Sequence, residues 1–241
     1  MQNSRETRLI ALRQQLAMLE RGGRTETVLP FGVPAIDAGL PAGGLPLGAL
    51  HEVEGEDEDN AAATGFLAGV LARLMPERPV LWCLVRPDLY APGLLRHGFQ
   101  TQRLILVRTS NDRDILWAIE EGLRSAALAA VVGEISALPM IASRRLQLAA
   151  ENSGVTGFVL HRQSEASTVS AAVTRWRIAS VPGALKAGEP GVGQPQWRVD
   201  LARCRGGRPG SWMVEACDAT GLVSLPATVA DRPAFRRRAN E

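Results

Sequence analysis

The chain has 241 residues, of which 46% are hydrophobic and 22% are charged, and its formal net charge is +2. This composition predicts one domain with a sizeable core and excludes an intrinsically disordered protein. The small net charge also excludes a polyanion-binding field over the whole surface.

Residues 1–23 are predicted to form an N-terminal helical arm. Between residues 4 and 20, leucines recur at 3-4-3 spacing and form a narrow apolar stripe, which Gly22 and Gly23 bring to an end. Such a stripe suits docking either on the home domain or on a partner protein. The candidate partner-binding residues are Leu9, Leu12, Leu16 and Leu19.

Residues 24–225 are predicted to form one α/β domain, which starts with a loop-rich segment at 24–46. Short apolar runs then alternate with helical patterns, which indicates a mostly parallel sheet covered by helices on both faces. The expected strands are 47–53, 79–85, 104–108, 129–135 and 157–161, and the expected helices are 60–75, 90–97, 112–128 and 139–151.

After residue 170 the pattern changes to an alternation of apolar and polar residues, in VTRWRIA, QWRVDLARC and SWMVEAC. We expect antiparallel strands that extend one edge of the sheet. The five tryptophans lie mostly inside predicted elements, so packing is expected for them, while Trp176 and Trp197, flanked by arginines, are candidates for exposed interface residues. Residues 226–241 are predicted to be a basic, flexible tail.

The chain begins with the polar run MQNSRETR, which does not fit a signal peptide. No uncharged apolar run reaches the roughly 18 residues that a transmembrane helix needs. Three widely spaced cysteines (Cys83, Cys204 and Cys217) argue against a disulfide framework. We therefore expect a cytoplasmic protein without a membrane segment, and the spacing of its histidines predicts no metal site.

The segment GEDEDNAAAT at 55–64 lies where an α/β protein would carry a phosphate-binding loop, G-x-x-x-x-G-K-[ST]. Counted from Gly55, the second glycine falls on Asn60, the lysine on Ala61 and the hydroxyl on Ala62. The sole lysine of the chain, Lys186, lies far away. Four acids at 56–59 would repel a triphosphate, and Asp59 or Asn60 is predicted to cap the following helix instead. We expect no nucleotide cofactor.

The element order, together with the leader FGVPAIDAGLPAGGLPLGALHEVEG, resembles the RecA recombinase core over residues 29–216. Within that superfamily the run RCRGGRPGSW at 203–212 and the altered loop at 55–62 are most similar to the ImuA family of RecA-like, SulA-like mutagenesis proteins.

This resemblance implies that three catalytic positions have lost their chemistry. In the phosphate-binding loop, Ala61 replaces the lysine and Ala62 replaces the hydroxyl residue. The catalytic glutamate position is occupied by Arg86. The Walker B aspartate falls on Gly133, with Glu134 one place late. We therefore expect no enzymatic activity.

Basic residues form two further candidate sites. The RecA resemblance implies that Arg203 and Arg205 stand where RecA filaments carry a Lys-x-Lys pair that reaches a neighbour's nucleotide. Together with Arg208 they are candidates for binding a partner's acidic surface and, for Arg205, DNA phosphate, the alternative being a solvated strand face. The acidic 52–59 segment is a candidate mate for them, in the same chain or a neighbouring one. The tail adds Arg236, Arg237 and Arg238 as candidate nucleic-acid contacts, whereas the loop 162–175 has few of the aromatic and basic residues that single-strand binding uses.

The ImuA resemblance implies a non-catalytic accessory role in SOS-induced, error-prone translesion DNA synthesis. The implied partners are ImuB, RecA and a DnaE-type polymerase, with weak DNA contact and an oligomeric state that the sequence leaves open. Two alternatives are a SulA-like cell-division inhibitor that binds FtsZ and a RecA-like enzyme that binds ATP and DNA.

Overall fold

The computed structural model describes residues 27–55, 59–74, 77–162, 169–183 and 194–226. Several expected features lie outside these residues. They are the arm with Leu9, Leu12, Leu16 and Leu19, three of the four acids (Glu56, Asp57 and Glu58), Lys186, and the tail with Arg236, Arg237 and Arg238.

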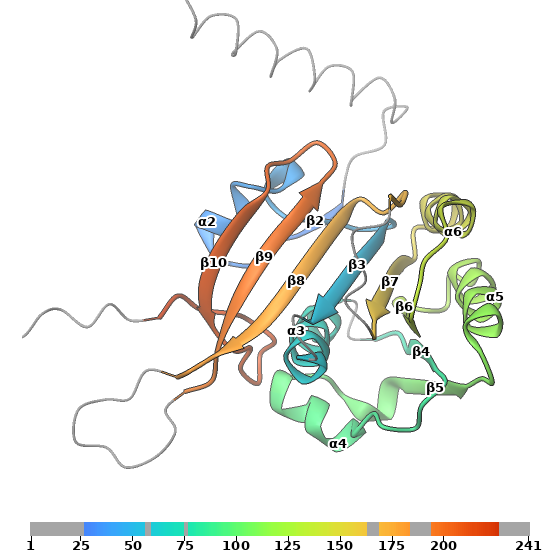
Figure 1. Cartoon of the computed structure of the whole chain (residues 1–241), viewed down its shortest axis with the longest axis horizontal. Coiled ribbons are helices and arrows are strands. Elements are labelled where there is room, and N and C mark those ends of the chain that lie inside the picture. The colour runs from blue at the N-terminus through green and yellow to red at the C-terminus, as the bar shows by residue number, and fades with distance from the viewer. Residues whose placement is uncertain (1–26, 56–58, 75–76, 163–168, 184–193, 227–241) are drawn as a thin grey trace, which may run out of the picture.

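One eight-stranded sheet organises the domain, in the order β10-β9-β8-β3-β7-β6-β4-β5 (Figure 1). Its strands are β3 (Leu50–Gly55), β4 (Val80–Leu84), β5 (Leu104–Arg108), β6 (Ala130–Ile135), β7 (Thr156–His161), β8 (Thr174–Val181), β9 (Gln196–Cys204) and β10 (Gly210–Glu215). A short ribbon of β1 (Val28–Leu29) and β2 (Leu45–Pro46) lies in the segment expected to be loop-rich.

The helices are α2 (Pro34–Asp37), α3 (Asn60–Arg73), α4 (Ala91–Leu94), α5 (Asp112–Leu123) and α6 (Met140–Ser153). Single 3₁₀ turns cover Pro41–Gly43, Leu95–His97 and Thr101–Arg103. Two apolar cores result, one on each face of the sheet. Phe66 and Leu67 of α3 pack with Trp82, Phe158 and Trp176 on one face. Ile115 and Ile119 of α5 and Leu146 of α6 pack with Val131 and Val159 on the other.

The predicted α/β class with a mostly parallel sheet is confirmed, and one strand direction is corrected. β8 pairs parallel to β3, so the antiparallel part begins only with β9, which runs antiparallel to β8 and to β10. The alternation in TRWRI reflects a strand with one apolar and one charged face, and this pattern does not distinguish parallel from antiparallel pairing. The expected helix 112–128 is also shorter, because α5 ends at Leu123.

The tryptophans correct two further expectations. Trp176 and Trp197 are only 1% and 5% exposed, although each has an arginine next to it in the sequence. Neighbouring residues of a strand point to opposite faces, so the arginines take one face and the tryptophans the core under α3. Trp117, which was expected to pack, is 65% exposed on α5. None of the helices in the described ranges is long and apolar enough to cross a membrane.

Candidate functional site

The turn from β3 into α3 corresponds to the predicted phosphate-binding loop. A Cβ on Gly55 would lie 2.6 Å from the carbonyl carbon of Asp59, so only glycine fits this close return of the chain. The first turn of α3 carries Asn60, half-buried, Ala61, exposed, and Ala62, buried. The described residues of this turn therefore present no cation and no hydroxyl group.

Asp59 does not cap α3 with its side chain, contrary to the prediction. Its carboxylate accepts a hydrogen bond from the Ser180 hydroxyl at 2.9 Å and a second, short one from the Ser180 backbone N–H. Ser180 lies near the end of β8, so Asp59 ties the start of α3 to that strand. The helix has no side-chain cap, and Asp59 contributes only its backbone carbonyl, which accepts from the Ala63 N–H at 3.2 Å.

The other two carried-over positions lie on or just beyond the neighbouring strands β6 and β4. Arg86 is exposed just beyond β4. On β6 the side-chain position of Gly133 faces α5, where a Cβ would come 2.0 Å from Ile119 Cδ1. An aspartate does not fit there, and the carboxylate on the α3 side of β6 belongs to Glu134.

Glu134 is 3% exposed and is held by two donors. The indole N–H of Trp82 donates to it at 2.6 Å, and Arg162 forms a short ion pair with it. Arg162 also pairs with the exposed Asp88 at 2.7 Å. Burial raises the pKa of Glu134, and the Arg162 guanidinium offsets this only in part.

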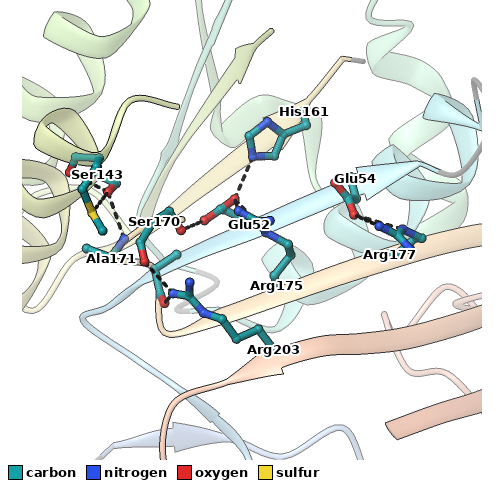
Figure 2. Close-up of polar contacts among 11 residues, drawn as sticks. Glu52, Glu54, Ser143, His161, Ser170, Ala171, Arg175, Arg177 and Arg203 are labelled. Atoms are coloured by element: carbon teal, nitrogen blue, oxygen red, sulfur yellow. Dashed lines mark hydrogen bonds and ion pairs between the residues drawn. The ribbon is translucent and has the colours of Figure 1, made fainter. Parts of the chain in front are cut away.

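A second polar cluster lies on the other face of the sheet and has Glu52 of β3 at its centre (Figure 2). One Glu52 carboxylate oxygen accepts from Arg175 Nε at 3.0 Å and from a terminal nitrogen of Arg175 at 2.6 Å, and it lies 2.9 Å from His161 Nε2. The other oxygen accepts a short hydrogen bond from the Ser170 hydroxyl. Burial acts to raise the pKa of Glu52, but the hydrogen bonds from His161 and Ser170 and the nearby positive charges outweigh it, so the pKa is lowered.

A second Glu–Arg pair joins β3 and β8 two residues further along the strands. Glu54 accepts from Arg177 Nε at 3.0 Å, just as Glu52 accepts from Arg175. The register of β3 and β8 places Glu52 opposite Arg175 and Glu54 opposite Arg177. Glu52 and Glu54 therefore have their ion-pair partners on β8, and Asp59 is bonded to Ser180, also on β8. Among the described residues of the 52–59 segment, the predicted pairing with Arg203 and Arg205 is present only as the electrostatic influence of Glu52 on Arg203, while Glu56, Asp57 and Glu58 lie outside the described residues.

Arg203 and Arg205 hold the backbone that leads into β8. Arg203 donates to the Ser170 carbonyl at 2.8 Å and, in a short contact, to the Ala172 carbonyl, and Arg205 donates to the Ala171 carbonyl at 2.8 Å. The Ala171 N–H donates to the Ser143 hydroxyl of α6 at 2.9 Å. Arg208 is exposed, and its backbone N–H donates to the Gly39 carbonyl at 2.8 Å. Partner binding by these arginines stays a prediction.

A third buried group is His51, for which burial disfavours the charged imidazolium. Its Nε2 lies 2.8 Å from the Pro46 carbonyl, which can only accept, so Nε2 carries the proton. In this neutral tautomer Nδ1 accepts from the Thr174 hydroxyl, which in turn accepts from the Trp176 indole N–H, each over 2.8 Å. Burial lowers the pKa of His51 to about 4.

Sequence reasoning missed the Glu52 cluster, although a signal for it exists. β3 reads Glu-x-Glu and β8 reads Arg-x-Arg, with apolar residues between the charges. Two strands of opposite charge with the same period pair naturally as neighbours. Among the described residues, no group of three or more His, Cys, Asp or Glu could hold a metal ion.

Comparison with known proteins gives one clear likeness. The chain is 44% identical over 216 residues to the curated Protein ImuA of Caulobacter vibrioides strain NA1000 / CB15N, a match that covers 83% of this chain and 88% of the relative. Protein ImuA of a second strain of the same species, ATCC 19089, matches with the same values. No family model matches the chain.

Proposed function

The chain belongs to the ImuA family, and from that premise we propose that it takes part in SOS-induced mutagenesis as a non-catalytic accessory protein. It acts by binding the proteins that carry out error-prone translesion synthesis, with ImuB, RecA and a DnaE-type polymerase as partners. The mostly parallel sheet with an antiparallel edge is the architecture that a RecA-like core requires, and it supports this assignment.

The observation that carries the non-catalytic role is the turn between β3 and α3. A phosphate-binding loop uses free N–H groups at a helix N-terminus together with a lysine. Here Ala61 and Ala62 provide neither an ammonium nor a hydroxyl, and the Asp59 carboxylate bound to Ser180 places a negative charge beside the helix start. An anionic triphosphate would meet repulsion at this position.

Titration calorimetry of the full chain with ATP and magnesium tests the nucleotide half of the proposal. We expect no binding and no phosphate release. The matched variant Asp59→Asn removes the negative charge but adds no lysine, so it too should fail to bind. Micromolar affinity of the unaltered protein for ATP would refute the proposal.

Affinity capture tests the binding half. We expect the full chain to retain ImuB, RecA or the DnaE-type polymerase, and a chain without residues 1–22 to retain less. Unchanged capture by the truncated chain would mean that residues 1–22 do not contribute to partner binding. Capture of FtsZ in place of these partners would favour the cell-division alternative.

A further inference from the structure

Strand β5 forms one of the two edges of the sheet, opposite the edge formed by β10 (Figure 1). Its neighbour among the described strands is β4 alone, in parallel register from Val80–Leu104 to Leu84–Arg108. Ile105 and Leu106 point to opposite faces and are 45% and 49% exposed. The strand is therefore open to solvent on both faces as well as along one side.

The open side presents unpaired backbone groups. The Thr109 N–H donates to the Leu84 carbonyl of β4 at 2.9 Å, and alternate residues of a strand direct their backbone groups to the same side. Leu104, Leu106 and Arg108 consequently direct theirs away from β4. The Leu104 N–H is already bonded to the Thr101 carbonyl, which leaves the Leu104 carbonyl and both backbone groups of Leu106 and of Arg108 facing the open edge.

Natural sheets usually protect such an edge with proline, a bulge or central charges. The sequence LILVR of β5 contains no proline, its register with β4 is unbroken, and its one charge lies at the end. An apolar, regular and unprotected edge of this kind is a template for another strand.

We propose that β5 pairs with β5 of a second copy of this chain, antiparallel, about a two-fold axis at Leu106. In this register the two Leu106 residues exchange reciprocal N–H to carbonyl bonds, and each Arg108 N–H donates to the Leu104 carbonyl of the other copy. All of these open groups except the Arg108 carbonyl are then used. Ile105 lies opposite Val107 of the second copy, so β-branched side chains pair across the junction.

Self-pairing fits this strand because a two-fold axis at Leu106 brings apolar residues together at the centre of the junction. Residues 105–107 are apolar, so these residues of one copy face the same residues of the other, and each Leu104 lies opposite an Arg108 at the ends. The two Arg108 side chains lie at opposite ends of the junction, roughly 14 Å apart along the strand direction, which keeps like charges separated. The occupant is therefore a second copy rather than a charged peptide.

Site-specific crosslinking tests the register. In a Cys204→Ser background, where Cys83 and Cys217 are buried, Leu106→Cys is placed opposite itself at the Cα separation that a disulfide needs. We expect Leu106→Cys to crosslink on mild oxidation. Val107→Cys alone should not, but should crosslink when mixed with Ile105→Cys. Equal crosslinking of Val107→Cys and Leu106→Cys alone would overturn the proposed pairing.

The oligomeric state of the full chain is the second measurement. Over a concentration series in analytical ultracentrifugation we expect a dimer, weakened at least about tenfold by Ile105→Arg, because the charge lies inside the apolar junction. The matched control Ile141→Arg makes the same exchange at a 76% exposed residue of α6 and should leave the dimer intact. A monomer at every concentration, or a dimer equally affected by both variants, would overturn the proposal.

Discussion

Glu52 and Glu134 are both buried carboxylates paired with arginines, yet they lie on opposite faces of the sheet and are held differently. Glu52 lies opposite Val159 in the core under α5 and α6, and Glu134 lies opposite Leu160 in the core under α3. The pKa of Glu52 is lowered by its partners, whereas the pKa of Glu134 is raised by burial.

The two pKa shifts differ in direction because Glu52 has more hydrogen-bond donors and because the arginine of Glu134 is shared with a second carboxylate. Glu52 receives hydrogen bonds from Arg175, His161 and Ser170, and Arg175 is itself buried. Glu134 receives them from Trp82 and Arg162, and Arg162 divides its charge between Glu134 and the exposed Asp88. Burial favours the neutral carboxyl in both places, and only the fuller donor set reverses that preference.

The largest expected effect is the loss of Glu52. Glu52→Ala leaves the Arg175 guanidinium, whose side chain is 8% exposed, without its carboxylate, and we expect the free energy of unfolding to fall by about 3–5 kcal/mol. Glu134→Ala should cost less, since Arg162 is 20% exposed and keeps Asp88. Urea denaturation of both variants measures the difference, and an equal or larger loss for Glu134→Ala would break the comparison.

The next largest effect is the loss of stability that His51 causes at acid pH. His51 has a folded pKa of about 4 against a usual value of 6.5, so the unfolded chain takes up a proton between these values. Stability should therefore fall as the pH drops from 6.5 to 4, by up to about 3 kcal/mol from this residue alone. The parent protein and the Glu52 and Glu134 variants should all lose this His51 contribution. It therefore cancels when the stability of a variant is subtracted from that of the parent at the same pH.

The variants Glu52→Gln and Glu134→Gln should change the pH dependence of stability in opposite directions. A lowered folded pKa gives stability that is present above the unfolded pKa and lost as the pH falls, so Glu52→Gln should flatten the acid limb of the stability curve. A raised folded pKa gives stability that is present below the unfolded pKa and lost as the pH rises, so Glu134→Gln should be better tolerated at pH 7 than at pH 4. Denaturation at both pH values checks this, and slopes of the same sign for the two variants would contradict it.

Gly133 provides a smaller and purely steric test of the face assignment. Gly133→Ala places a Cβ 2.0 Å from Ile119 Cδ1, and we expect it to cost about 1–3 kcal/mol through overpacking. Ile119→Val removes that methyl group, so the double variant should recover part of the loss relative to Ile119→Val alone. A harmless Gly133→Ala would mean that α5 does not press on β6 as described.

Much of this arrangement follows from the sequence, and the remainder depends on pairing between distant segments. Apolar runs and helical patterns were enough to predict β3, α3 and β4 to β7, because their periods are local. The partner of Glu52 was not predictable in the same way, since it depends on β8 lying beside β3 across more than a hundred residues. Asp59 illustrates the same limit: its local context favours a helix cap, but Ser180 from a distant strand captures the carboxylate.

The smallest effect separates burial from the mere number of contacts. Arg124 reaches Glu120 at 2.6 Å and Glu121 at 2.5 Å, contacts as short as those of Arg175, but its side chain is 57% exposed. Water screens such pairs, so Arg124→Ala should change the free energy of unfolding by less than about 0.5 kcal/mol. Urea denaturation beside Arg175→Ala provides the measurement. A comparable loss of unfolding free energy for Arg124→Ala and Arg175→Ala would mean that the number of contacts alone determines the loss. Burial would then not contribute to the difference between Glu52 and Glu134, which would depend only on the number of donors.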